Sequence, residues 1–335
     1  MSQTAEKQEN ESPLERLSQT LDGDMRAVNA VIIDRMQSPV ALIPKLASYL
    51  IAAGGKRIRP MMTLAAARLC GYEGDAHLKL AATVEFIHTA TLLHDDVVDE
   101  SEQRRGRPTA NLLWDNKSSV LVGDYLFARS FQLMVETGSL TVLDILSNAA
   151  AVIAEGEVLQ MSVAMNIETT EETYLQVVRG KTAALFEAAT EVGGVIAGRP
   201  EAEVRALARY GDALGVSFQM VDDLLDWGGA SGDLGKNTGD DFRERKLTLP
   251  LIRAIAKSDA EERAFWARTI GKGDQQSGDL DQAHALLIKH GALEETRAEA
   301  LRFADIAKDA MSELPEHPLR EMLRDLADYV VARIT

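Results

Sequence analysis

The sequence predicts an all-α fold, a bundle of helices in a single domain. Proline is scarce, with 9 residues in 335, and 46% of the residues are hydrophobic. Alanine and leucine recur while runs of β-branched residues stay short, a composition that favours helices over strands. Several stretches of helical period are apolar around most of their circumference. Helices of that kind are typical of the interior of a large bundle.

The helical stretches follow one another without a compositional break between domains. Residues 1–12 are polar and acidic and predict a disordered tail, so the folded domain is expected over 13–335. Thr169 and Glu172 have the spacing of a capping box and predict a helix start. Residues 228–246, rich in glycine and aspartate, predict the longest loop of the central region and a lid. Long helices are expected over 60–71, 75–99, 118–138, 140–165 and 200–227.

Charge and cysteine content limit the partners and the compartment. The formal net charge is −16, from 52 acidic and 36 basic residues, which argues against a nucleic acid as the main partner. The single cysteine, Cys70, excludes an intrachain disulfide and is typical of a reducing cytoplasm. The first residues lack a signal-peptide pattern, and no apolar run reaches about 20 residues. We expect a cytoplasmic protein with no membrane span.

Two acidic clusters of identical spacing are the strongest functional signal. In each, aspartates four residues apart lie on one helix face, where like charges destabilise the helix. Leucines and valines surround them, so an unpaired charge there is costly. Magnesium, which binds a few carboxylates together with substrate phosphate oxygens, resolves both problems. The alternative for one cluster alone is a solvated acidic face. The clusters are Asp95, Asp96 and Asp99, and Asp222, Asp223 and Asp226.

Basic residues close to the first cluster are suited to phosphate. Lys56, Arg57 and Arg59 follow a glycine pair just before a helix, and Arg104 and Arg105 follow the first cluster. Either run taken alone is more often a solvated patch than a binding site. In a strongly acidic chain with two metal-binding clusters, they predict contacts to diphosphate groups.

His88 lies two helical turns before the first cluster and on its face. A lone helical histidine is usually structural, but this alignment makes it a candidate ligand of a diphosphate.

At these residues the sequence resembles the all-trans polyprenyl diphosphate synthases of the long-chain type that make quinone side chains. Both aspartate motifs, the Gly-Gly-Lys-Arg segment and the Arg-Arg pair occur in that family's order, from about residue 14 onward. The resemblance implies the isoprenoid synthase fold, a helical bundle around a central cavity. It also implies two or three Mg²⁺ ions per active site and a homodimer.

The resemblance implies a role for each matching residue. Asp95, Asp99, Asp222 and Asp226 would bind metal, with Asp96 and Asp223 in support. Isopentenyl diphosphate would be held by Lys56, Arg59, His88 and Arg105, and Arg57 would also bind substrate. The allylic diphosphate would be held by Arg104, Lys181, Lys236 and Lys246, with Thr182 and Gln219 near the reacting carbon. On residue physics alone, the three lysines are ordinary surface residues.

Product length is expected to depend on the helix that precedes the first cluster. The growing chain would pass Thr91, Ala90 and Ile87. Short-chain members of the family carry bulky aromatic residues four or five places before the motif, whereas Thr91 and Ala90 are small. The alternative is that Ala90 is small only for helix packing. We expect a product of roughly forty to fifty carbons, toward the decaprenyl end, for ubiquinone biosynthesis.

The expected reaction is ionisation of farnesyl or geranyl diphosphate, attack by isopentenyl diphosphate, and loss of a proton, with transient membrane contact for product release. One alternative is a terpene cyclase, which usually has a different second metal motif. Another is a non-catalytic subunit of a heteromeric synthase, in which one aspartate motif is typically degraded. A helical metal-binding scaffold is the third.

Overall fold

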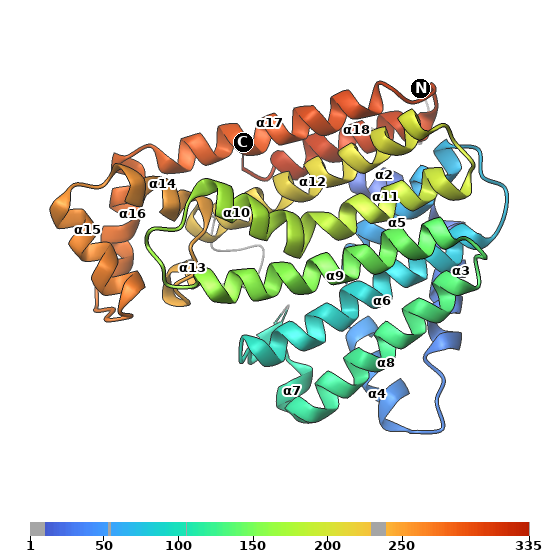
Figure 1. Cartoon of the computed structure of the whole chain (residues 1–335), viewed down its shortest axis with the longest axis horizontal. Coiled ribbons are helices and arrows are strands. Elements are labelled where there is room, and N and C mark those ends of the chain that lie inside the picture. The colour runs from blue at the N-terminus through green and yellow to red at the C-terminus, as the bar shows by residue number, and fades with distance from the viewer. Residues whose placement is uncertain (1–10, 53–54, 105, 229–238, 335) are drawn as a thin grey trace. The chain divides into compact units, whose positions relative to one another are not determined.

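The computed structural model describes residues 11–52, 55–104, 106–228 and 239–334 (Figure 1). Within these ranges the regular structure is helical apart from one antiparallel ribbon, β1 (Gln103–Arg104) with β2 (Arg107–Pro108). The prediction of an all-α fold is therefore confirmed. No helix in these ranges is long and apolar enough to cross a bilayer.

The chain divides into two compact units, each built from three separate stretches. Unit 1 comprises Met1–Ala150, Leu185–Gly211 and Ala310–Leu326. Unit 2 comprises Ala151–Ala184, Asp212–Asp309 and Ala327–Thr335. The boundaries fall inside helices and not in linkers. The single domain expected over 13–335 stays a prediction.

Unit 1 contains the first acidic cluster. Its α5 is buried along its length except at Arg59 and Arg68. The 23-residue α6 packs along α5, α3 and α8. Figure 1 shows α6 and α8 running side by side. The helices wholly within unit 1 are α2 (Pro13–Thr20), α3 (Asp22–Arg35), α4 (Leu42–Ala52), α5 (Ile58–Leu69), α6 (Ala76–Val98), α7 (Ala110–Leu113) and α8 (Asn116–Val135).

Unit 2 contains the second acidic cluster, on a helix that begins in unit 1. The helices wholly within unit 2 are α10 (Glu171–Val178), η1 (Arg179–Ala183), α13 (Asp240–Arg243), α14 (Leu249–Lys257), α15 (Ala260–Trp266), η2 (Ala267–Gly271) and α16 (Asp279–Lys289). The helices with residues in both units are α9 (Leu140–Val163), α11 (Ala184–Ile196), α12 (Glu201–Gly228), α17 (Ala292–Met311) and α18 (Pro318–Val331).

The long predicted helices are present with small shifts at their ends. The helix expected over 75–99 is α6, with Asp75 as N-cap and Asp99 as C-cap. The capping box predicted at Thr169 is wrong by one residue. Thr170 is the N-cap of α10, and its side chain accepts a hydrogen bond from the amide of Thr173. Thr169 has a glutamate at the capping-box spacing, but it is the side chain of Thr170 that accepts a backbone amide at the start of the helix.

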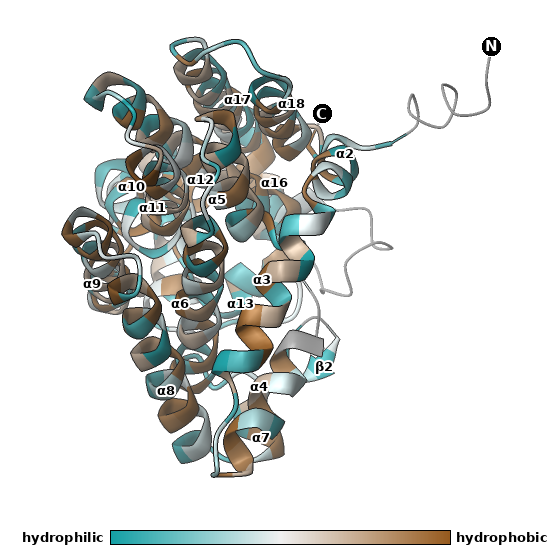
Figure 2. Cartoon of the chain, turned by 90° about the vertical axis from the view of Figure 1, so that its right-hand side faces the viewer, coloured by the Kyte–Doolittle hydropathy of each residue, from teal (hydrophilic) through white to brown (hydrophobic). Residues whose placement is uncertain are grey.

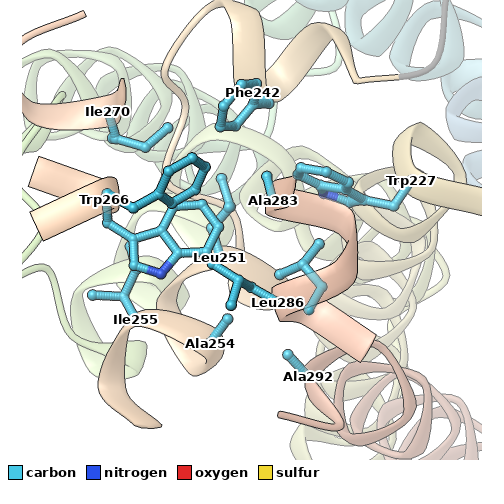
Figure 3. Close-up of a cluster of buried hydrophobic side chains, with 12 residues drawn as sticks. Trp227, Phe242, Leu251, Ala254, Ile255, Trp266, Ile270, Ala283, Leu286 and Ala292 are labelled. Atoms are coloured by element: carbon cyan, nitrogen blue, oxygen red, sulfur yellow. The ribbon is translucent and has the colours of Figure 1, made fainter. Parts of the chain in front are cut away.

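The core of unit 2 beside the second cluster contains four aromatic side chains among twelve buried residues that the structure describes (Figure 3). Trp266 is fully buried, and Trp227, which follows the last aspartate of the cluster, meets Phe242 edge to face with ring centroids 6.2 Å apart. Phe242 belongs to the short helix α13, inside the segment predicted to be a loop. Burial of large aromatic side chains fixes the position of so short a helix, which has little stability of its own.

Candidate active site

The first cluster forms the last turn of α6. Asp95 is half-buried, Asp96 is 1% exposed, and Asp99 is exposed at the C-cap. The amide of Asp99 donates to the carbonyl of Asp95 at 2.8 Å, so the turn is closed. The two outer carboxylates therefore lie one turn apart on an accessible face, while the middle one points into the protein.

Protein donors hold the middle aspartate. Arg104 donates from Nε and Nη2 to one carboxylate oxygen of Asp96, both at 2.8 Å. The carbonyl of Asp96 accepts from the amide of Ser101 at 2.9 Å and from Asn111 Nδ2 at 3.2 Å. Burial raises the pKa of Asp96, and Arg104 opposes that shift. Arg104, predicted to contact the allylic diphosphate, is here the partner of the buried carboxylate.

The basic segment before α5 is held in an unusual backbone conformation. Lys56 is exposed, and Arg57, at the N-cap, has φ of 50°. A non-glycine residue in the left-handed region costs about 1 kcal/mol or more, and such strain concentrates at functional sites. Arg57 forms an ion pair with Glu85 of α6. Of the three other described non-glycine residues with positive φ, Glu100 and Arg245 also lie beside predicted site residues, whereas Met165 does not.

Arg59 and His88, both predicted to hold isopentenyl diphosphate, lie together in unit 1. Arg59 Nη1 is 3.5 Å from His88 Nε2. Arginine has no acceptor, so a bond here makes Nε2 the accepting nitrogen of a neutral imidazole. The guanidinium also lies over the ring of Phe186, 4.3 Å from its centroid. This cation–π contact fixes the direction of Arg59.

The residues predicted to set product length line α6 in the two turns before the cluster. Ile87 and Ala90 are fully buried. Thr91 is half-buried, and its hydroxyl donates to the carbonyl of His88 at 2.8 Å. The small side chain of Ala90 thus lies in packed protein in this structure.

The second cluster repeats the pattern of the first within unit 2. Asp222 and Asp226 are half-buried, and the middle aspartate, Asp223, is 3% exposed. Asp222 Oδ1 is 3.2 Å from Arg333 Nη1, which belongs to the end of the chain. Both oxygens of Asp226 accept backbone amides of α13, from Asp240 at 3.1 Å and Asp241 at 3.0 Å. Asp226 therefore anchors the start of α13.

A chain of hydrogen bonds fixes the buried Asp223. Tyr174 donates its hydroxyl to Oδ2 at 2.6 Å, and Gln219 donates Nε2 to Oδ1 at 2.9 Å. Thr182 donates to Gln219 Oε1 at 2.9 Å. Burial raises the pKa of Asp223 to about 6, although Tyr174 and Gln219 favour the carboxylate. Thr182 and Gln219, predicted to lie near the reacting carbon, are thus linked to the second cluster.

Lys181 lies in the π-helical turn η1, a form that often marks functional sites. Its Nζ donates to Glu157 Oε2 at 2.8 Å and to Gln160 Oε1 at 2.9 Å, both on α9. The turn and α9 approach closely because both carry glycine. A Cβ on Gly156 would lie 2.7 Å from the amide nitrogen of Lys181, and one on Gly180 3.0 Å from Gly156 Cα.

The remaining predicted residues are less informative. Lys246 is paired with Glu244 at 2.5 Å. Arg105 and Lys236 lie outside the described residues, as does most of the predicted lid. In unit 1, Arg104 lies with the first cluster, and Arg59 lies with His88. Unit 2 brings together the second cluster, Gln219 and Thr182.

Comparison with known proteins decides the family. The polyprenyl synthetase family matches residues 40–287. The chain belongs to the polyprenyl synthetase family. It is 47% identical to an octaprenyl diphosphate synthase of Escherichia coli, over 96% of this chain and 99% of that protein. The prediction of a prenyltransferase is confirmed.

Two solved structures of the family are also similar. A decaprenyl diphosphate synthase from Rhodobacter capsulatus has a TM-score of 0.94 and 68% identity, covering 96% of this chain and 99% of that one. A polyprenyl synthase from Caulobacter crescentus, complexed with calcium and isoprenyl diphosphate, has a TM-score of 0.91 and 54% identity, covering 95% and 97%. The isoprenoid synthase fold predicted from the sequence is confirmed.

The outer carboxylates of both polyprenyl synthetase motifs fit a hard divalent cation. Asp95 and Asp99 offer oxygen donors at i and i+4, as do Asp222 and Asp226. Among the described residues no three histidine, cysteine, aspartate or glutamate side chains form a ligand group. Magnesium commonly takes only one or two carboxylates and completes its shell with water and substrate phosphates. A carboxylate pair is therefore a sufficient protein contribution.

Sequence reasoning missed several residues that hold the motifs. Tyr174 and Arg333 are 49 and 111 residues from the aspartates they contact, and nothing local marks them. Asn111 follows the ribbon, and no local sequence pattern marks it as a contact of the motif either. One signal was available in the sequence. Gly123 lies in the middle of the long helix α8, and because glycine disfavours helices, its presence there indicates a close contact with a neighbouring element.

Proposed function

We propose that this chain is a long-chain all-trans polyprenyl diphosphate synthase. It adds isopentenyl diphosphate head to tail onto farnesyl or geranyl diphosphate, to roughly forty to fifty carbons, the range of the octaprenyl and decaprenyl relatives. The observation that carries the proposal is the repeated geometry of the two motifs. In each, protein donors hold a buried middle aspartate and two outer carboxylates remain more accessible.

The outer carboxylates are assigned to two or three Mg²⁺ ions. Bound magnesium supplies the positive charge that neutralises a departing diphosphate, so that the allylic carbon becomes a carbocation. Asp95 and Asp99 in unit 1, and Asp222 and Asp226 in unit 2, hold the metal ions. Calcium in the Caulobacter crescentus structure supports a divalent cation site in this family. Asp96 and Asp223 position their neighbours.

The cations of the chain hold the diphosphate groups. Arg59, fixed by His88 and Phe186, is assigned with Lys56 and Arg57 to isopentenyl diphosphate. Lys181, held in place by Glu157 and Gln160, is assigned to the allylic diphosphate. Arg59 and Lys181 are preorganised by these protein contacts, so little ordering of the two side chains remains to be done when substrate binds.

The rest of the roles follow the same assignment. His88, Arg104 and Arg105 serve the two diphosphates, with Lys236 and Lys246 on the allylic side. Thr182 and Gln219 lie near the reacting carbon, where their polar groups stabilise the cation before the double bond of isopentenyl diphosphate attacks. The released diphosphate accepts the proton, so no side chain is assigned as base.

A homodimer with an apolar interface is part of the proposal. The exposed apolar residues of α8 include Leu121, Phe131 and Val135, at helical spacing on one face. Leu112 and Leu113 of α7 are also exposed, and Figure 2 shows the hydrophobic residues of both helices in brown. Apolar stripes of this kind mark protein interfaces. A cytoplasmic location, transient membrane contact for product release and supply of a ubiquinone side chain remain predictions.

The activity is tested by incubating purified protein with farnesyl diphosphate, labelled isopentenyl diphosphate and Mg²⁺. We expect incorporation that a chelator abolishes and excess Mg²⁺ restores. Asp95→Asn and Asp222→Asn should each lower turnover by about a hundredfold or more, because each removes a charged metal ligand. Asp305→Asn, on an exposed part of α17, is the control. Metal-independent incorporation, or none by the wild-type protein with any primer, contradicts the proposal and in the second case favours a partner-requiring subunit.

A further inference from the structure

His94, the residue before the first aspartate motif, fills a notch in the neighbouring helix α8. A Cβ built on Gly123 would lie 2.2 Å from His94 Nε2 and 2.7 Å from Cδ2. Both distances are shorter than non-bonded carbon contacts allow. The imidazole therefore occupies the space in which any other residue at 123 would place its side chain.

The ring is also held along the face of α8 on either side of the notch. Its Nε2 lies 3.2 Å from the carbonyl of Val120 and 3.5 Å from Asp124 Oδ1. Because a carbonyl only accepts, the ring donates from Nε2. The ring of Phe127 stacks on it, with centroids 6.0 Å apart and planes at 26°. Val120, Asp124 and Phe127 are spaced by four and three residues, so these contacts follow one helix face.

These contacts fix α6 against α8 where the motif begins. A ring seated in a notch resists both sliding and rotation of its helix. Asp95 is the next residue, turned by about 100° from His94 around the helix axis. On the other side of the turn, Asp96 is held by Arg104 and Asn111. The last turn of α6, which carries the outer aspartates, is thus held from two sides.

We propose that His94 is a positioning residue for the first aspartate motif and acts through the notch at Gly123. The inference rests on the proposed function, because it gives Asp95 and Asp99 their role as metal ligands. His94 does not touch the reacting atoms in this account. Its ring directs Asp95 and Asp99 so that the metal and diphosphate meet a preformed carboxylate pair.

The test compares wild-type protein with Gly123→Ala, His94→Ala, the double variant and His94→Gln. Gly123→Ala expels the ring, so we expect the Mg²⁺ concentration for half-maximal activity to rise about tenfold, with a smaller change in kcat. His94→Ala should behave alike. The double variant should be no worse than His94→Ala, because no ring remains for the added methyl to displace. Glutamine places an amide N–H where Nε2 was, so His94→Gln should restore Mg²⁺ dependence to within about threefold.

A second readout does not require activity. The amides of Asp99 and Ser101 close the last turn, donating to Asp95 and Asp96 at 2.8 and 2.9 Å. Their hydrogen exchange should accelerate about tenfold in His94→Ala and Gly123→Ala, while exchange in α5 stays unchanged. Gly23→Ala, at a helix position with open space, is the control and should change neither readout.

Two results would overturn the inference. One is a lower melting temperature in His94→Ala and Gly123→Ala with unchanged exchange at Asp99 and Ser101 and unchanged Mg²⁺ dependence, which is the behaviour of a packing residue. The other is an additive double variant. Wild-type protein that fails to incorporate isopentenyl diphosphate would remove the proposed function, and the exchange experiment would still decide whether the notch holds the turn.

Discussion

At the scale of single residues, the middle aspartate of each motif is the best-defined side chain. Asp96 and Asp223 are both nearly inaccessible. Arg104 donates from two nitrogens to the carboxylate of Asp96 at 2.8 Å, and Tyr174 and Gln219 donate to the carboxylate of Asp223 at 2.6 and 2.9 Å. A buried carboxylate is tolerated only with such partners. The outer aspartates are more exposed. The alternation explains how one short sequence both anchors a helix turn and presents metal ligands.

Removing the hydroxyl of Tyr174 tests whether the buried middle aspartate anchors its motif. Tyr174→Phe leaves Asp223 with one donor fewer in a buried site, so we expect the free energy of unfolding to fall by about 1–3 kcal/mol. Turnover should fall about tenfold as the motif loses its position. Urea unfolding and steady-state kinetics measure the two effects. Tyr125→Phe is the control, because its hydroxyl donates to the carbonyl of Gln37 at an exposed site. Wild-type values for both quantities in Tyr174→Phe would refute the positioning role of this bond.

Ala90 tests the predicted control of product length. Ala90→Phe places a ring beside the path proposed for the growing chain and should shorten the main product by several isoprene units. Ala81 is equally buried but lies nine residues away, on the opposite side of α6. Ala81→Phe should therefore cost similar stability, about 1–3 kcal/mol from overpacking, and leave the product unchanged. Unchanged length in an active Ala90→Phe enzyme would mean that Ala90 is small only for packing.

At the scale of elements, the sequence predicted where helices lie better than what joins them. The helices before both clusters were predictable because period and apolar surface agree over many turns. Two features were not predicted, because both depend on residues that are distant in the sequence. The π-helical turn η1 exists where Gly180 meets Gly156, and α13 exists where Asp226 and Phe242 hold it. Local sequence carries neither contact.

The close approach of η1 and α9 predicts the effect of one methyl group. Gly156→Ala would place a Cβ 2.7 Å from the backbone nitrogen of Lys181, and backbone cannot rotate away as a side chain can. We expect a loss of about 1–3 kcal/mol and a fall in turnover as Lys181 moves. Gly23→Ala, in open space, should instead be neutral or stabilising, since alanine favours helix. Equal effects of the two substitutions on unfolding and turnover would contradict this account.

The junction of α15 and α16 predicts a dependence of stability on pH. Glu262 is bonded to Lys289 and to His290, and these partners, Lys289 foremost, hold its pKa at about 2. Its ordinary value is 4.5, so the stabilisation is complete above pH 4.5 and is lost as pH falls toward 2.

Glu262→Gln should accordingly lower the free energy of unfolding by roughly 1–2 kcal/mol at pH 7, and the difference from wild type should shrink by pH 3. Urea unfolding at several pH values measures it. Glu261→Gln, at the exposed carboxylate next to Glu262, is the control. A difference that does not change with pH would show that the ion pairs at Glu262 are not its source.

At the scale of the whole molecule, family and reaction class followed from the order and spacing of the motifs. The sequence could not predict which aspartate of each motif is buried, because burial depends on contacts with the side chains of Arg104, Tyr174 and Gln219. The sequence also could not distinguish two roles of Arg104, that of a ligand of the substrate and that of the hydrogen-bond partner of Asp96. Product length depends on several helices together, so the sequence predicted only a range of chain lengths.

The most direct test of the central claim is mass spectrometry of the dephosphorylated products made from farnesyl diphosphate and isopentenyl diphosphate over a time course. The account predicts linear products that grow through intermediates and end at roughly forty to fifty carbons, as in the octaprenyl and decaprenyl relatives. A final product of fifteen or twenty carbons would contradict the long-chain assignment, and a cyclic hydrocarbon would contradict the reaction class.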